Sequence, residues 1–334
     1  RFERIAVEAD PDASEREPTR PATQYLRDAS RTVIARNESP DVGFERSVNP
    51  YRGCAHGCTY CFARPTHEYL GFSAGLDFET KILVKEKAAE LLREELSSPR
   101  WKPQVVAMSG VTDPYQPVER RLRLTRRCLE VLAEFRNPVI LITKNHLITR
   151  DADLLAELAS HGAAAVFVSV TTLDQGLQRI LEPRTSTPRR RLEAIAELVR
   201  AGVPTGALVA PVIPGLTDHE IPAIVAAAAA AGARFAGHVP LRLPWAVKDL
   251  FERWLEDHFP ERKEKILNRI RDIRGGRLND PSFGSRMRGE GAFAEEIHAL
   301  FAVACRRAGI GAERVTLSAA AFRRPGGAQL RLFQ

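Results

Sequence analysis

The sequence predicts an α/β protein built on a partial (β/α)6 barrel, with an N-terminal arm and a helical C-terminal extension. Short apolar runs alternate with amphipathic segments of helical period, which is the pattern of a parallel sheet with crossover helices. The apolar runs lie at 105–108, 139–143, 165–170, 206–209 and 237–241, and the helical segments at 85–96, 123–135, 151–161 and 190–201. With the strand that leads into Cys54, these runs make six β/α units. An open-sided barrel of this kind would leave a lateral mouth for a large substrate.

The segments outside the barrel lack this alternation. Residues 1–44 are polar and charged with early prolines, and we expect a loose arm in which only 32–35 forms a short strand. The barrel is expected over 45–244. Residues 245–322 form the helical extension: a charged helical segment at 245–274, a break at Gly275 and Gly276, and a helix at 293–308. A flexible tail is expected over 323–334.

The composition is that of a soluble globular protein, with 44% hydrophobic and 27% charged residues among 334. Five cysteines do not make a disulfide framework, so we expect a reducing, cytoplasmic location. No apolar run is long enough to span a bilayer, the N-terminus has no signal peptide, and no membrane partner is expected. The net charge of +7 and the excess of arginine over lysine favour phosphate binding, although genomic base composition also explains the excess.

Three cysteines in one short segment carry the main chemical signal. Cys54, Cys58 and Cys61 can hold three corners of a four-iron–four-sulfur cluster, and no fourth cysteine lies nearby. One iron left open in this way suits coordination by a substrate or cofactor. The alternative is a structural zinc site with His56 or His67 as fourth ligand, although zinc ligands usually come as two separated pairs. Cys128 and Cys305 are isolated and are expected to be buried small hydrophobes.

The cysteine motif resembles the signature of the radical S-adenosylmethionine (SAM) superfamily. The segments 49–53, 112–119, 143–144 and 182–215 are similar to the spore photoproduct lyase-related branch, and the resemblance runs from about residue 45 to 245. It implies a 4Fe-4S cluster whose open iron is chelated by S-adenosylmethionine. An electron from the cluster then cleaves the cofactor to a 5′-deoxyadenosyl radical, which takes a hydrogen atom from the substrate. A reductant such as flavodoxin or ferredoxin would supply the electron.

Several polar residues fall at the carboxyl ends of the predicted strands, where parallel α/β folds bind ligands. The resemblance implies cofactor-binding roles for Tyr60, Phe62, Ser109, Lys144, Ser169 and Ile213. Lys144 would face the carboxylate of S-adenosylmethionine, Phe62 would lie against its adenine, and Ile213 belongs to an apolar wall at 211–214. Taken singly, Ser169 could be a strand-end residue whose hydroxyl is hydrogen-bonded within the protein, and Lys144 a solvent-exposed residue that caps a strand.

The segment 113–117 supplies two candidate catalytic residues, Asp113 and Tyr115. Tyr115 would line the substrate space, or the two prolines simply make a rigid turn. The photoproduct lyases have a hydrogen-donor cysteine just before the aspartate, whereas here residues 109–112 hold no thiol, and Phe62 replaces a tyrosine. Cys128 is a possible spatial substitute. Basic stretches at 120–127 and 184–191 are solvated helix faces by default, or they face a polyanion.

The last residues resemble the short peptide by which bacterial repair proteins dock on the sliding clamp. Leu330, Leu332 and Phe333 would fill apolar pockets and Gln329 would orient the backbone, unless the segment is a terminal strand. The favoured function is therefore a radical SAM enzyme, lyase-like or modifying, that acts on nucleic acid, with DNA favoured, in DNA repair or base modification. Radical chemistry on a peptide, protein or metabolite is the first alternative. A non-enzymatic iron–sulfur or zinc DNA-binding adaptor is the second.

Overall fold

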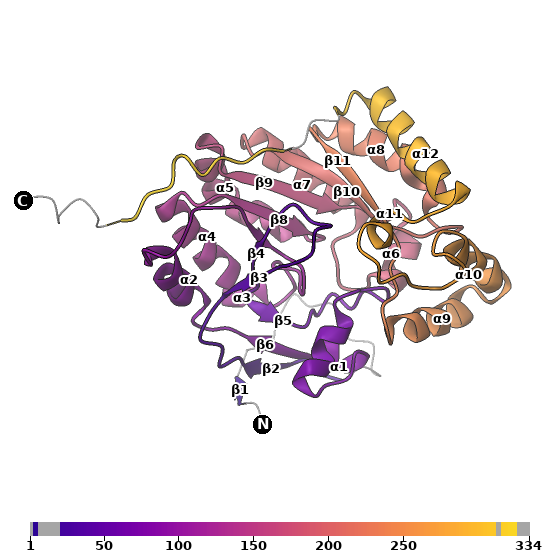
Figure 1. Cartoon of the computed structure of the whole chain (residues 1–334), viewed down its shortest axis with the longest axis horizontal. Coiled ribbons are helices and arrows are strands. Elements are labelled where there is room, and N and C mark those ends of the chain that lie inside the picture. Colours follow the sequence, from indigo (N-terminus) through magenta and orange to yellow (C-terminus); the bar gives the residue numbers. More distant parts are fainter. Residues whose placement is uncertain (1–2, 6–20, 312–314, 326–334) are drawn as a thin grey trace, which may run out of the picture.

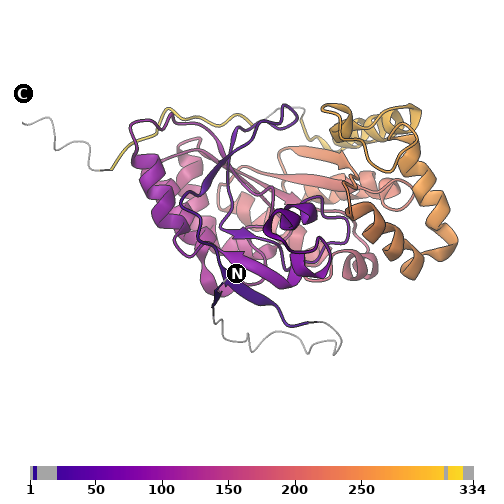
Figure 2. The same ribbon diagram turned by 60° about the horizontal axis from the view of Figure 1, so that its bottom comes forward.

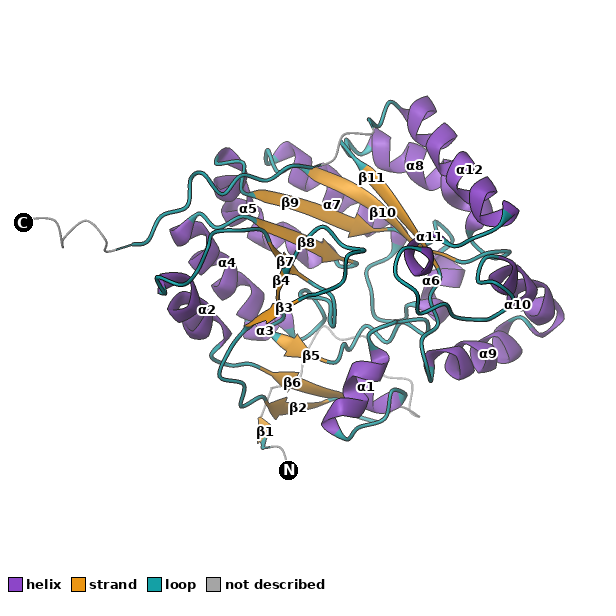
Figure 3. Cartoon of the chain, in the orientation of Figure 1, coloured by secondary structure: helices purple, strands orange, loops and turns teal. Residues whose placement is uncertain are grey.

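A seven-stranded sheet forms the centre of the computed structural model, which describes residues 3–5, 21–311 and 315–325 (Figures 1 and 3). Its order is β11-β10-β9-β8-β7-β4-β3. All neighbours pair in parallel except β3 with β4. The strands are β3 (Ile34–Arg36), β4 (Arg46–Val48), β7 (Val106–Met108), β8 (Val139–Thr143), β9 (Ala164–Ser169), β10 (Thr205–Val212) and β11 (Ala236–Pro240). The prediction of six parallel strands is confirmed, and β3 and β11 are edges, so the sheet does not close.

Crossover helices pack against the sheet, and those at 124–135, 152–160 and 188–200 begin near the predicted residues. They are α3 (Glu119–Leu122), α4 (Leu124–Phe135), η2 (His146–Asp151), α5 (Ala152–Ser160), α6 (Gln175–Leu181), α7 (Pro188–Arg200), η3 (Asp218–Glu220) and α8 (Ile221–Ala230). Asp174 caps α6 by accepting bonds from the N–H groups of Gly176 and Leu177. The main core lies between strands and helices, and it is lined by side chains such as Met108, Leu141 and Val166 that are fully buried.

The first crossover, between β4 and β7, is longer than the others and carries the cysteines. It contains β5 (Tyr51–Arg52), η1 (Arg64–Leu70), α1 (Leu76–Thr80), β6 (Lys81–Val84) and α2 (Ala88–Ser97). Strands β5 and β6 join β1 (Arg4–Ile5) and β2 (Gln24–Arg27) in a second sheet of order β1-β2-β6-β5. Figure 2 shows this smaller sheet and α1 on one side of the main sheet.

The N-terminal segment is more ordered than the expected loose arm. β2 pairs in parallel with β6, and β3 pairs antiparallel with β4. Leu26 and Val33 are buried, so a few apolar side chains fix the segment although most of its residues are polar. Backbone pairing of this kind leaves little trace in hydrophobic periodicity, which is why the sequence suggested only one short strand.

The C-terminal extension is helical, as expected, but its charged first part is two helices. These are α9 (Val247–His258) and α10 (Lys263–Asp272), separated by η4 (Pro260–Arg262), and they are followed by α11 (Ser285–Arg288) and α12 (Ala292–Ala308). Helix α12 packs on α8 (Figure 1). Phe251 and Ile266, from α9 and α10, share an apolar cluster with Cys58 and Tyr60, so these helices cover one side of the cysteine segment.

None of the helices in the described ranges is long and apolar enough to cross a membrane. The predicted clamp-binding residues Gln329, Leu330, Leu332 and Phe333 lie outside the described residues.

Candidate functional site

The cysteine segment follows β5 as a tight loop at the carboxyl edge of the main sheet. Gly53 and Gly57 have φ of +80° and +69°, the left-handed region that favours glycine. The Cys54 N–H donates to the Phe78 carbonyl over 2.9 Å. A Cβ on Gly53 would lie 2.8 Å from that same carbonyl oxygen. The glycines therefore let the backbone turn closely enough to gather three thiols in one loop.

The three thiols are free, close together and largely buried, with Cys54 and Cys58 only 7% and 8% exposed. Burial raises the pKa of Cys61 to about 11, and the neighbouring Cys54 adds to this effect. Burial also raises the pKa of Cys58, and Glu182 raises it further. Because only thiolates bind iron, a cationic group is needed to keep these sulfurs deprotonated, and an iron cluster supplies that charge. The donor set fits such a cluster.

The zinc alternative does not fit the arrangement of the described side chains. In the described part of the chain, no three His, Cys, Asp or Glu side chains are arranged to hold one metal ion. Both ring nitrogens of His56 lie near other groups, Asp113 Oδ2 at 3.4 Å and Asn145 Nδ2 at 3.3 Å. His67 Nε2 lies 2.9 Å from the Lys81 carbonyl. In a cluster, by contrast, each thiolate binds a different iron and the sulfurs need not converge on one point.

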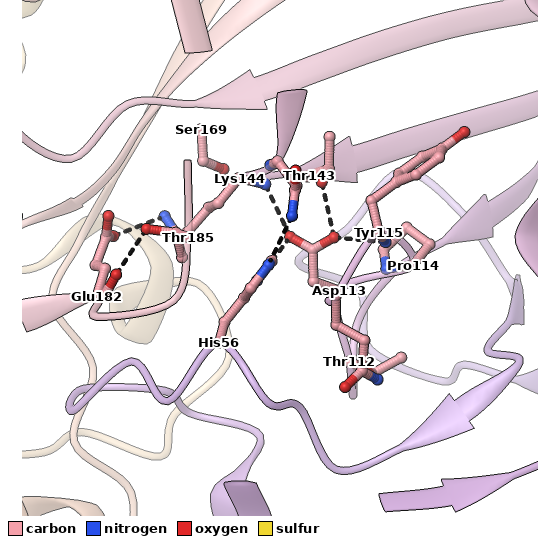
Figure 4. Close-up of polar contacts among 12 residues, drawn as sticks. His56, Thr112, Asp113, Pro114, Tyr115, Thr143, Lys144, Ser169, Glu182 and Thr185 are labelled. Atoms are coloured by element: carbon pink, nitrogen blue, oxygen red, sulfur yellow. Dashed lines mark hydrogen bonds and ion pairs between the residues drawn. The ribbon is translucent and has the colours of Figure 1, made fainter. Parts of the chain in front are cut away.

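Asp113 ties the cysteine loop to the ends of β7 and β8 (Figure 4). Its carboxylate accepts hydrogen bonds from Thr143 Oγ1 at 2.7 Å and from the Lys144 N–H at 2.8 Å, and His56 lies on its other side. Burial by itself would raise the pKa of Asp113, but the His56 charge and these hydrogen bonds lower it below its usual value. Asp113 therefore stays ionised and positions the loop; the structure shows it bonded to protein groups on both oxygens.

A buried charged network lies beside the cysteines. Lys144 Nζ is 3.2 Å from Glu182 Oε1, and it donates to Thr171 Oγ1 at 3.1 Å and to the Ala210 carbonyl at 2.9 Å. Glu182 also accepts bonds from Tyr60 and Arg191. Burial would raise the pKa of Glu182, but Arg191 and Lys144 lower it well below its usual range. The ammonium group of Lys144 is thus held at the strand ends by fixed acceptors.

The other predicted cofactor residues gather around the same edge. Ile213 is fully buried in one apolar cluster with Cys58 and Tyr60, and Lys144 Nζ lies 5.7 Å from the Tyr60 ring centroid. Ser169 ends β9 and is 4% exposed. Phe62 directly follows Cys61 and is half exposed. Ser109 follows β7 and is partly buried. The structure therefore brings the cysteine loop and four strand ends together.

Tyr115 lies elsewhere. Its side chain is fully buried in the main core, and its hydroxyl lies 3.1 Å from Asp151 Oδ2. Figure 4 shows the ring turned away from Asp113 and His56. This placement corrects the expectation that Tyr115 lines the substrate space and agrees with the rigid-turn interpretation. Cys128 is likewise fully buried in the main core, so it does not substitute for a donor thiol near Asp113.

Sequence reasoning missed the residues that hold the site together. His56 and Glu182 lie next to recognised motifs, but their partners are 57 and 122 residues away in the chain. Arg64 is buried and donates from Nε to the Cys58 carbonyl at 3.0 Å. Gln116 accepts from the Ala55 N–H at 2.9 Å. For the charged residues among these, the available signal was a charge inside an apolar stretch of sequence, because buried charges need partners.

Comparison with known proteins agrees with this geometry. Residues 48–228, more than half of the chain, match the family model described as the Radical SAM superfamily. An uncharacterized protein of Mycobacterium tuberculosis is 39% identical over 260 residues, which cover 76% of this chain and 75% of that protein. A radical SAM Nα-GlyT isomerase of Pseudomonas phage M6 is 28% identical over 175 residues, 52% of this chain and 34% of that protein.

Solved structures show the same fold. Spore photoproduct lyase complexed with dinucleoside spore photoproduct aligns with a TM-score of 0.59 at 16% identity, over 85% of this chain and 79% of that one. At 16% sequence identity, this similarity shows a shared fold and does not by itself show the substrate.

Proposed function

This chain belongs to the radical SAM superfamily, and from that premise we propose that its substrate is a nucleic acid, DNA in the first place, which it repairs or modifies at a base. Superfamily membership makes the chain an enzyme that uses a 4Fe-4S cluster and S-adenosylmethionine. The position of the three-thiol loop, against the charged network at the carboxyl edge of the sheet, supports the radical chemistry, and the net charge and the fold support the substrate.

Cys54, Cys58 and Cys61 would hold the cluster, in a loop that Arg64, Gln116 and Asp113 keep in place. When bound, the cluster and S-adenosylmethionine supply one-electron chemistry that ends in removal of a hydrogen atom from a substrate. A one-electron reductant such as flavodoxin or ferredoxin is needed. The apolar side chains of α9 and α10 exclude water from one side of the loop.

Lys144 would bind the carboxylate of S-adenosylmethionine. Its side chain is 15% exposed, and its Nζ already meets three acceptors. Because an ammonium group has three N–H donors, binding the carboxylate would exchange one of these contacts for one to the cofactor. Tyr60, Phe62 and Ile213 would line the adenine, and Ser109 and Ser169 would bind from the ends of β7 and β9. We place this catalytic unit in residues 45–244, with 245–322 as its cover.

The nucleic acid substrate is supported by charge and by fold. The net charge of +7 suits a polyanion. The fold is shared with an enzyme crystallised with a dinucleoside photoproduct, although the two sequences are only 16% identical. The absence of a thiol at 109–112 separates this chain from the lyases, so base modification is as consistent with the site as dimer reversal.

The test is anaerobic reconstitution of the iron–sulfur cluster, reduction, and quantification of 5′-deoxyadenosine with and without UV-irradiated DNA. We expect formation that DNA stimulates and that Cys58→Ala abolishes. Formation that ignores irradiated, intact and single-stranded nucleic acid alike, but rises with a peptide or metabolite fraction, would contradict the proposed substrate and leave the enzyme class intact.

A further inference from the structure

A cluster of arginines borders the cysteine loop on the side of β11. Arg242 follows β11, and its guanidinium carbon lies 5.4 Å from the centroid of the Phe62 ring. Phe62 is the residue directly after Cys61. On its other side, Arg242 Nη1 lies 3.3 Å from the sulfur of Met287, on α11. Arg242 thus stands between the cysteine loop and a segment of the C-terminal extension.

A second arginine fixes that segment in place. Arg274 is 3% exposed, and its guanidinium donates to the Leu241 carbonyl at 2.6 Å and to the Arg286 carbonyl at 2.9 Å. The chain after β11 is therefore joined to α11 through one buried side chain. Arg286 itself donates to Asp41 and, over 2.6 Å, to Ser39 Oγ, which anchors the segment to the N-terminal part of the chain. This arrangement is rigid and is not a loose surface loop.

Among the described residues, Arg242 has no carboxylate bonded to its guanidinium group. Its Nε is buried and has no hydrogen-bond partner in the described part of the protein. Burial lowers the pKa of Arg242, and the nearby Arg286 lowers it further. The neighbouring carboxylate, Asp41, is already bonded to Arg286 and Gly284. A partly exposed guanidinium that forms no ion pair within the described residues, beside a second guanidinium, is suited to bind an anion, and guanidinium groups match phosphate oxygens.

Two exposed aromatic residues belong to the same segments as these arginines. Phe283 is 60% exposed, with the Arg286 guanidinium 4.3 Å from its ring centroid. Trp245, three residues after Arg242, is 69% exposed and has φ of +46°, a left-handed conformation that is strained for tryptophan. Such strain often marks functional positions. Large rings exposed next to arginines are the arrangement with which proteins stack unpaired bases while binding the backbone.

We propose that Arg242, Arg286, Phe283 and Trp245 form a rim that binds a single-stranded segment of nucleic acid next to the cysteine loop. Arg242 binds phosphate, Arg286 adds positive charge beside it and carries the Phe283 ring, and Phe283 and Trp245 stack bases. The inference deepens the proposed function and rests on it. A single strand, or a base turned out of a duplex, is required because a stacked, paired base offers no free face to these rings.

The test is fluorescence anisotropy of a labelled single-stranded oligonucleotide with the reconstituted full chain, titrated over a range of salt concentrations. Phe283→Ala should weaken binding by about 5- to 150-fold, because one stacking contact is lost. Arg242→Gln should weaken binding and reduce the slope of log affinity against log salt by about 0.7, the effect of one lost phosphate contact on a single strand. Both variants should keep the iron content and unfolding midpoint of the wild type.

Two matched controls isolate the rim. Arg200→Gln removes an exposed arginine at the end of α7. This residue lies near the amino end of β10, whereas the cysteine loop and the rim lie at the carboxyl ends of the strands, so binding should be unchanged. Tyr69→Ala removes an 82% exposed ring on η1 and should also have no effect. Polyglutamate should bind weakly, since it offers charge without bases.

The outcomes separate the two proposals. If Phe283→Ala and Arg242→Gln bind like the wild type while oligonucleotides still stimulate S-adenosylmethionine cleavage, the rim is wrong and the nucleic acid substrate stands. If polyglutamate binds as tightly as the oligonucleotide and Phe283→Ala changes nothing, the rim binds an acidic peptide instead. If the wild type binds no oligonucleotide at low salt, both proposals fail.

Discussion

Lys144 Nζ lies 3.2 Å from Glu182 Oε1, and the Glu182 side chain is fully shielded from solvent. The pair joins the end of β8 to the residue that follows α6, within contact of Tyr60 in the cysteine loop. A buried pair of this kind does not by itself add stability, because both charges lose their hydration. Its effect is on position: the ammonium group is fixed beside the thiols.

Replacement of Glu182 by glutamine should destabilise the protein by about 3–5 kcal/mol, because Arg191 and Lys144 would keep buried charges without their counter-charge. The free energy of unfolding in urea measures this change. Glu193→Gln, at a solvent-exposed pair with Arg189, is the matched control and should have no measurable effect. Equal unfolding midpoints for the two variants would contradict the role given to this network.

Gly53→Ala should lower both stability and iron incorporation. The left-handed conformation costs an L-residue about 1–2 kcal/mol, and the new Cβ would lie 2.8 Å from the Phe78 carbonyl that holds the Cys54 N–H. Unfolding and iron content after reconstitution are the measurements. Gly43→Ala, where an added Cβ meets nothing within 4 Å, should behave like the wild type. A Gly53→Ala protein with full iron content would show that the turn is not needed.

If the three thiols bind the cluster as proposed, variants of each cysteine should show the same loss of iron. Cys54→Ala, Cys58→Ala and Cys61→Ala should each lose most of the bound iron and sulfide and the visible absorbance after reconstitution. Cys305→Ala, which removes a partly buried cysteine on α12, should keep them. Wild-type protein that takes up one zinc ion per chain in preference to iron would restore the zinc interpretation.

A histidine pair between β11 and α12 should make stability depend on pH. His238 Nε2 lies 2.7 Å from His298 Nδ1, and His298 Nε2 lies 2.9 Å from the Arg288 carbonyl. Burial, together with His298 and Arg288, lowers the pKa of His238 from 6.5 to about 4. The folded protein therefore favours the neutral ring, whose contribution is fully present above pH 6.5 and is lost as pH falls from 6.5 towards 4.

Unfolding midpoints at several pH values test this dependence. The wild type should lose stability between pH 6.5 and 4, and His238→Asn should lose less over that interval. His219→Asn, at an exposed histidine near α8, should follow the wild type. Parallel curves for the wild type and His238→Asn would show that the histidine pair does not titrate as described.

Local patterns were enough to predict the sheet and the cysteine loop. β8 was predicted at residues 139–143, the bounds it has in the structure, because a buried parallel strand is a continuous apolar run. The three cysteines lie within eight residues, so their proximity needs no knowledge of the fold. The β2 strand was missed because it has only four residues, Gln24–Arg27, too few to show a period, and it pairs through the backbone.

The contacts that arrange the site could not be read from the sequence. Tyr60 meets Glu182 from 122 residues away, and His56 meets Asp113 from 57, because crossover connections bring strand ends together regardless of their separation along the chain. Tyr115 was misjudged for the same reason. The turn at 113–117 was predicted, but its sequence does not say which side of the sheet the ring enters, and the ring packs in the core near Asp151.

The most direct test of the central claim is transfer of deuterium from deuterated DNA into 5′-deoxyadenosine. Reconstituted, reduced protein would be incubated with S-adenosylmethionine and uniformly deuterated, UV-irradiated or single-stranded DNA, and the product analysed by mass spectrometry. We expect deuterium in the 5′-deoxyadenosine formed by the wild type and none with the Cys58→Ala variant. 5′-Deoxyadenosine that forms in the presence of bound DNA without deuterium would contradict a nucleic acid substrate.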